Sequence, residues 1–122
     1  MRLALLPEIA DILKQLKEFL PTLVAAAEEV TALLQQGETA RGMRGLAELV
    51  TGLQTLERVL DFLCASCRAE LPELEGARGR IEAVFPSLLA AIEEEDPVAI
   101  GDVLSYELVP ALASCREELP GW

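Results

Sequence analysis

The three cysteines are the residues of this chain whose types and spacing come closest to a reactive or metal-binding site. Cys64 and Cys67 form a C-x-x-C pair, and Cys115 adds a third thiol to a chain that contains no histidine. Three thiolates could hold a zinc ion or respond to redox state, and zinc would then need a carboxylate such as Asp61 as its fourth ligand. However, reactive C-x-x-C pairs owe their low thiol pKa to a helix N-terminus, whereas this pair falls late in an expected helix. We therefore expect the cysteines to pack as small hydrophobes, with no metal and no cofactor, and keep a thiolate metal-binding or redox-sensing protein as the alternative.

Carboxylates could also support catalysis, but the partners they would need are missing from the sequence. Bundles that bind two iron ions combine inward glutamates with E-x-x-H motifs, and a chain without histidine has none. A serine nucleophile would likewise lack a histidine or a suitably placed lysine as its base. Glu57 and Asp61 lie one helical turn apart, yet Glu57 falls beside the expected core positions and indicates a solvated edge. The sequence therefore predicts a protein without enzymatic activity.

The charge balance argues against two classes of partner. The chain has 21 acidic and 10 basic residues, which give a formal net charge of −11 and a pI near 4.3. The basic residues are scattered along the sequence, whereas affinity for phosphate backbones and anionic lipid heads comes mostly from clustered Lys and Arg. We expect neither nucleic acid nor membrane as a partner, and we interpret the acidity as a source of solubility.

Length and hydropathy indicate one soluble domain over residues 1–122. Hydrophobic residues make up 52% of the chain, and a chain of this size has room for a single core. No uninterrupted apolar run approaches the ~18 residues of a membrane span, and the longest candidate, 19–27, contains Pro21. The short apolar stretch behind Arg2 is followed at once by Pro7 and Glu8, unlike a secretory signal. We expect a cytoplasmic protein.

Apolar periodicity predicts four helices over nearly the whole chain. They are separated by breaks at Gln36-Gly37, Leu71-Pro72 and Asp96-Pro97. The first helix is expected over 7–36, with Gly37 as a left-handed stop and Thr39 as the cap of the next helix. Its expected core positions follow alternating three- and four-residue steps: Ile9, Ile12, Leu16, Phe19, Leu23, Ala26, Val30 and Leu33.

The same kinds of signal define the other three helices. The second is expected to end at Leu71, because a residue before proline avoids the α region, and Pro72 can open the third. Asp96 and Pro97 form a helix start signal, an N-cap carboxylate followed by proline at the first position, and the fourth helix is expected to reach about Leu119. The expected core stripes are Leu46, Leu49, Leu53, Leu56, Leu60, Leu63 and Cys67, then Ile81, Val84, Leu88 and Ile92, then Leu104, Leu108, Ala111, Cys115 and Leu119. Short connections make neighbouring helices antiparallel, so the expected fold is all-α, an antiparallel up-down-up-down four-helix bundle.

Prolines and glycines interrupt these helical patterns. Pro21, Pro86 and Pro110 lie inside three of the helices, and each lacks the N–H of the helical ladder and crowds the carbonyl four residues earlier. We therefore expect proline-kinked helices that bend around the core. Gly45 and Gly52 lie on the flank of the second core stripe, where each costs about 1 kcal/mol of helix propensity relative to alanine. We expect a neighbouring helix to approach closely at these two glycines.

One face of the fourth helix carries more apolar surface than a solvated face needs. A projection at 100° per residue places five residues opposite the core stripe. These residues, called the outer face below, are Val98, Asp102, Tyr106, Val109 and Ala113. Tyr106 is the only tyrosine of the chain, and tyrosine is enriched at interfaces because its ring is apolar while its hydroxyl can still form hydrogen bonds. With Glu107 at its boundary, the outer face is our candidate interaction site; scattered surface apolar residues are the alternative.

The same segment carries a resemblance to a known family. Residues 102–112 read D-V-L-S-Y-E-L-V-P-A-L and follow Glu95-Asp96. They resemble the C-terminal D-x-L-x-Y-E-L-x-P-x-L signature of a poorly characterised family of small all-helical proteins from Gram-positive bacteria. The resemblance covers about the last quarter of the chain and implies no assigned activity, although some members occur alongside flagellar and motility-associated proteins. Five residues after the proline, where relatives are often aromatic, this chain has Cys115.

These features favour a non-catalytic protein–protein interaction module, an adaptor or chaperone-like partner in flagellar or surface assembly. Two other classes stay open. One is the thiolate metal-binding or redox-sensing protein built on Cys64, Cys67 and Cys115. The other is a structural homo-oligomer, for which a two-fold dimer through the outer face is expected because like patches then meet.

Overall fold

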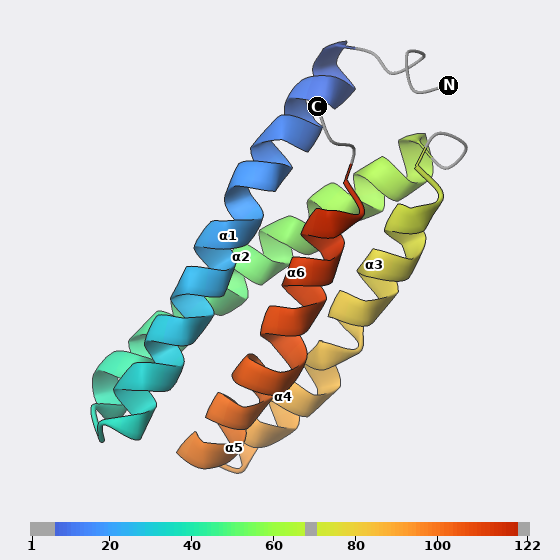
Figure 1. The fold of residues 1–122 in the computed structure, drawn as a ribbon. Coiled ribbons are helices and arrows are strands. Elements are labelled where there is room, and N and C mark those ends of the chain that lie inside the picture. Colours follow the sequence, from blue (N-terminus) through green and yellow to red (C-terminus); the bar gives the residue numbers. More distant parts are fainter. Residues whose placement is uncertain (1–6, 68–70, 120–122) are drawn as a thin grey trace.

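The computed structural model describes residues 7–67 and 71–119, and every regular element in these ranges is a helix (Figure 1). The elements are α1 (Pro7–Gln35), α2 (Thr39–Ser66), α3 (Glu73–Glu82), α4 (Val84–Glu93), α5 (Pro97–Val103), the π-helical η2 (Leu104–Leu108) and α6 (Val109–Glu117). α3 and α4 follow one another directly, and α5, η2 and α6 form one continuous helical segment, Pro97–Glu117. The sequence-based expectation of an all-helical protein is confirmed.

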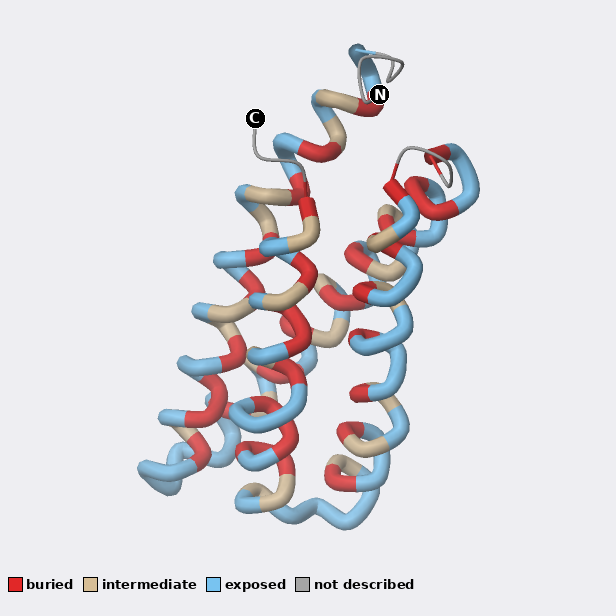
Figure 2. Tube along the Cα trace, turned by 45° about the vertical axis from the view of Figure 1, so that its right-hand side comes forward, coloured by how far each residue is buried: buried red, intermediate tan, exposed pale blue. Residues whose placement is uncertain are grey.

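The long helices of the described ranges lie side by side (Figure 1). α1 packs against α2 on one side and against α5, η2 and α6 on the other. α3 packs against both α2 and α6, while α4 packs against α5. Apolar side chains from all of these elements form one buried cluster, and the buried positions follow the inward side of each helix (Figure 2). A single core therefore holds the described part of the chain together.

The turn between α1 and α2 confirms one sequence signal and contradicts another. Gly37 has φ +80°, and its N–H donates to the Leu34 carbonyl while the Glu38 N–H donates to the Leu33 carbonyl, at 3.2 and 2.9 Å. This is the glycine stop that was expected, since the left-handed conformation costs glycine little. Thr39, expected to cap α2, is instead its first residue. Glu38 holds the cap position and forms no side-chain cap hydrogen bond, so this helix start is fixed by the preceding turn.

The start of α5 follows the sequence signal closely. Asp96 has an extended backbone, and its carboxylate accepts hydrogen bonds from the N–H groups of Val98 and Ala99 at 3.0 and 3.2 Å. Pro97 takes the first helical position, where a missing N–H costs nothing. Elsewhere the bounds differ slightly from expectation. α2 ends at Ser66 and not at Leu71, with residues 68–70 outside the described ranges.

The three interior prolines are accommodated in three ways. α1 continues through Pro21, and the Lys17 carbonyl that this proline cannot bond instead accepts from Nε of Arg116 at 3.4 Å. Before Pro86 the helix is interrupted at Ala83, between α3 and α4. Around Pro110 the helix widens to the π-helical turn η2, in which the Val109 N–H donates to the carbonyl of Leu104.

The α1–α2 contact is tight because glycines line it. A Cβ added at Gly52 would lie 2.8 Å from Cδ2 of Leu23, and one at Gly45 would lie 3.0 Å from Cγ2 of Val30. The expected close approach of a neighbouring helix is therefore confirmed, and that helix is α1.

The core stripe of α1 was predicted with a partial error: it is centred on Leu13, Leu20, Ala27 and Leu34, while Ile12, Phe19, Ala26 and Leu33 are only half-buried.

One described helical segment, Pro97–Glu117, is long and apolar enough to cross a membrane by length and composition alone. Its most apolar window is 44% buried inside the structure. The segment packs against α1, α3 and α4.

Candidate functional site

The outer face lies along α5, η2 and α6, and most of it is exposed. Tyr106 and Val98 are 77% and 72% exposed, more than any other large apolar side chain in the described ranges. Asp102 and Ala113 are exposed as well. Val109 differs from the expectation, because it is half-buried and packs against the core. The outer face therefore consists of two prominent apolar side chains with a carboxylate between them.

The π-helical turn explains why Val109 is displaced from the outer face. The most deeply buried positions run from Ile100 to Leu112 in steps of four residues, against 3.6 residues for an α-helical turn. The extra residue is absorbed in η2, so residues after it are rotated relative to a regular projection. Pro110 is exposed where Val109 was expected. A constant 100° per residue could not detect this shift.

Glu107, expected at the boundary of the outer face, is exposed and lines a shallow groove of about 320 Å³ between η2 and the α3–α4 junction. Arg80 lines the same groove and forms an ion pair with Glu118 at 2.5 Å. The remaining oxygen of Glu118, Oε2, is buried without a hydrogen-bond partner. The only basic side chain lining this groove is thus already bonded to another carboxylate.

The three cysteines are buried, as expected for packing residues. Burial, helped by the nearby carboxylate of Glu118, raises the pKa of the Cys115 thiol to about 11. Cys64 also contributes to this shift and so lies near Cys115. Among the described residues, no three Cys, Asp or Glu side chains gather in an arrangement that could hold a metal ion. A protonated, buried thiol is a poor nucleophile and a poor metal ligand.

A second surface, which sequence reasoning missed, is an open groove of about 550 Å³ between α2 and α4. Its apolar lining is Val50, Leu53, Phe85, Leu88, Leu89 and Ile92, and its remaining lining is Gln54, Glu57, Glu82 and Pro86. We call it the α2–α4 groove. The available signal was the density of apolar residues on α4, which exceeds the stripe of Val84, Leu88 and Ile92 that a core contact requires.

Comparison with protein families gives one match. The family model described as a domain of unknown function, DUF8042, matches residues 11–118. This chain belongs to the DUF8042 family. No curated protein and no solved structure matches it. The family description assigns no activity, but the matched span includes both the outer face and the α2–α4 groove of this DUF8042 domain.

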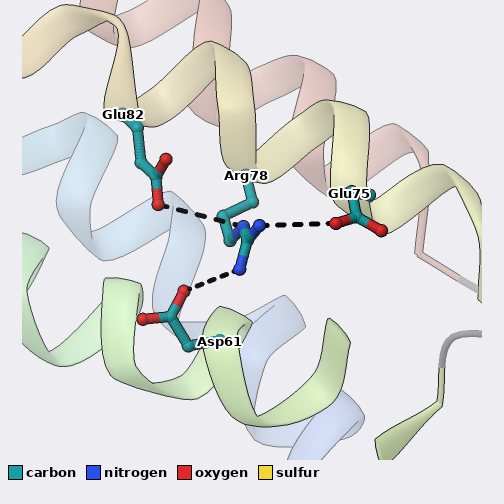
Figure 3. Close-up of polar contacts among 4 residues, drawn as sticks. All are labelled: Asp61, Glu75, Arg78 and Glu82. Atoms are coloured by element: carbon teal, nitrogen blue, oxygen red, sulfur yellow. Dashed lines mark hydrogen bonds and ion pairs between the residues drawn. The ribbon is translucent and has the colours of Figure 1, made fainter. Parts of the chain in front are cut away.

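The polar chemistry of the DUF8042 domain is concentrated in an ion cluster around Arg78, shown in Figure 3. The guanidinium lies 3.0 Å from Asp61, 3.4 Å from Glu75 and 3.8 Å from Glu82. The hydrogen bond to Asp61 is the main reason why the pKa of Arg78 is raised. Asp61, considered above as a zinc ligand, is thus bonded to Arg78 and joins α2 to α3. The cluster stabilises a helix contact and offers no nucleophile with an adjacent base.

Proposed function

We propose that this DUF8042 domain is a non-catalytic protein–protein interaction module, an up-down-up-down four-helix bundle that binds a protein partner through its outer face. One observation carries the proposal: the two most exposed large apolar side chains of the described ranges, Val98 and Tyr106, both lie on that face. Exposed tyrosine with neighbouring apolar residues is typical of the centre of protein interfaces.

Asp102 gives the outer face a polar contact between its two apolar side chains. A partner would cover Tyr106 and Val98 and could donate a hydrogen bond to the Asp102 carboxylate, which would fix its orientation. The resemblance described above adds the role of an adaptor or chaperone-like partner in flagellar or surface assembly, in the cytoplasm. A second copy of the chain is the other partner that an apolar face of this kind admits.

The proposal is tested with a variant that removes both apolar side chains from the outer face. We expect Val98→Ser combined with Tyr106→Ala to abolish capture of a partner by the full-length chain, or to split a dimer, measured by affinity capture and by sedimentation equilibrium. The melting temperature should change little, because exposed substitutions usually cost under about 0.5 kcal/mol. Val109 is left intact because it packs against the core.

Phe62→Ser provides the matched control, because Phe62 is a similarly large apolar side chain, 49% exposed, on α2. This variant should retain the interaction. If instead the double variant keeps its interaction, or loses it only together with several kcal/mol of stability, the outer face is a structural feature and the proposal is wrong.

A further inference from the structure

The α2–α4 groove has the anatomy of a helix-binding surface. Leu53 and Leu88 are almost fully buried and form its floor, while Val50, Phe85 and Ile92 are half-buried along its sides. Leu89 is 57% exposed, although it follows a leucine that is only 3% exposed. Apolar side chains therefore continue from the core out to the rim of the groove.

The groove exists because α2 and α4 diverge. α2 packs against α1 and, towards its C-terminal end, against α3, but it makes only marginal contact with α4. α4 in turn rests on α5. One side of α4 thus has no neighbouring helix to cover its apolar residues. A helix from a bound partner could cover them.

The charges around the groove indicate the kind of helix it accepts. Both charged residues that line it, Glu57 and Glu82, are acidic, and the acidic run 93–96 begins at the last residue of α4. No basic residue of the described ranges lines the groove, and Arg78, which is paired with Glu82 at 3.8 Å, is also bonded to Asp61. An acidic partner, including a second copy of a chain with net charge −11, would meet like charge here. A basic partner would meet opposite charge, which favours both encounter and correct orientation.

We propose that the α2–α4 groove binds an amphipathic helix of a partner protein whose apolar stripe is flanked by lysine or arginine. The apolar residues of the stripe would cover Leu89 and Phe85, and the basic residues would lie beside Glu57 and Glu82. α4 has 10 residues and is therefore about 15 Å long. That length matches anchors at i, i+3 or i+4, and i+7 on the bound helix. This surface is separate from the outer face, so it stands or falls independently of the function proposed above.

The experiment uses two labelled helix-forming peptides of about 15 residues with the same leucine stripe. One carries lysines beside the stripe and the other carries glutamates. We expect the lysine peptide to bind the full-length chain in fluorescence anisotropy at least about tenfold more tightly than the glutamate peptide at low salt, with a smaller difference at about 0.3 M NaCl because added salt screens the charges.

Variants locate the binding surface. Leu89→Ser should weaken lysine-peptide binding several-fold, and Glu57→Gln should reduce the preference for lysine over glutamate without removing binding by the leucine stripe. Val98→Ser with Tyr106→Ala, on the outer face, should leave peptide binding unchanged. Circular dichroism melts will check that each variant is folded. The substitution at Leu89 should leave the fold intact because this side chain is largely exposed.

Four results would overturn the inference. These are failure of both peptides to bind, equal binding of both peptides, binding that survives Leu89→Ser but not Tyr106→Ala, and self-association of the chain that Leu89→Ser abolishes. The third result would assign the peptide to the outer face, and the fourth would make the groove a contact between copies of this chain. Neither outcome tests whether the outer face binds its own partner, so the two proposals fail separately.

Discussion

Single residues show how this chain compensates for missing backbone donors. Each interior proline leaves a carbonyl without its helical N–H. At Pro21 the loss is local, because the guanidinium of Arg116 donates to the Lys17 carbonyl from the C-terminal helix. The Arg116 side chain therefore satisfies a free carbonyl of α1 and connects α1 to α6. At Pro110 the ladder itself changes to a π-helical turn, and a wider turn lets the proline ring avoid the carbonyl of Tyr106.

The burial of Cys115 predicts a specific dependence of stability on pH. Its thiol has an ordinary pKa of 9.0, which burial raises to about 11 in the folded protein. Above pH 9 the unfolded chain releases this proton while the folded chain keeps it, so the contribution of Cys115 to the free energy of unfolding should be constant below pH 9 and fall between pH 9 and 11. The loss should reach up to roughly 2 to 3 kcal/mol, and urea melts across this range would measure it.

Cys115→Ala is the control for this titration. Its stability below pH 9 will be lower because a buried sulfur atom is removed, but its decline between pH 9 and 11 should be shallower than in the wild type. If the free energy of unfolding falls equally with pH in the two proteins, the pKa of Cys115 does not differ between the folded and unfolded states, and the prediction is wrong. Alkylation at pH 8 provides an independent reading, since the native thiol should react slowly and the denatured thiol quickly.

At the scale of whole helices, the sequence specified ends and buried stripes better than rotations. Gly37 and Asp96 act through local backbone chemistry, so their roles were predictable from residue type and position alone. The α2 stripe from Leu46 to Leu63 was also predicted correctly, because that helix is regular. Val109 was placed wrongly because η2 inserts one residue into the turn before it. The sequence reveals the proline that favours such a turn. It does not reveal whether a π-helical turn forms there, as at Pro110, or an interruption of the helix, as near Pro86.

The α2–α4 groove was out of reach of sequence reasoning for a different reason. A stripe on one helix identifies which residues seek a neighbour, but it does not give the angle at which that neighbour crosses. α2 packs against α3 and makes little contact with α4. The angle at which α2 crosses these helices depends on side-chain packing over the whole core. Leu89, which belongs to none of the predicted core stripes, becomes a candidate binding residue only when the position of α2 is known.

An added methyl group should have different effects at two helical glycines, Gly79 in α3 and Gly52 in α2. Alanine at Gly79 in α3 would meet nothing within 4 Å, so Gly79→Ala should stabilise the protein by about 1 kcal/mol through helix propensity, or roughly 3 to 6 °C in Tm. Gly52→Ala gains the same propensity, but its Cβ would lie 2.8 Å from Leu23. Overpacking costs about 1 to 3 kcal/mol, so Tm should stay level or fall. Thermal melts in which both variants gain stability equally would show that α1 and α2 are not closely packed at this position.

At the scale of the whole molecule, charge is distributed very differently from apolar surface. The core of the described ranges is almost entirely apolar, with Thr31 as its one buried polar residue, whose hydroxyl donates to the Ala27 carbonyl at 2.9 Å. The acidic excess therefore lies outside the core. It surrounds two apolar surfaces, the outer face with Asp102 and the α2–α4 groove with Glu57 and Glu82. Both surfaces would accept contacts from hydrogen-bond donors or cations, which agrees with the partners proposed for them.

The acidic excess predicts that added salt will stabilise this protein. Two effects of opposite sign compete, because salt weakens the attraction in ion pairs such as Arg78–Asp61 and also weakens the repulsion among like charges. The ion pairs are partly exposed and contribute little, whereas 21 acidic residues against 10 basic residues leave 11 negative charges uncompensated. Repulsion should dominate, so Tm should rise as NaCl increases from about 0.02 to 0.3 M, a range in which the Debye length falls below about 10 Å.

Arg78→Gln should make the rise steeper, because it leaves the carboxylates of Asp61, Glu75 and Glu82 beside one another without their cation. A Tm that falls with salt in the wild type, or an Arg78→Gln variant with the shallower slope, would mean that paired charges outweigh the net charge of the molecule.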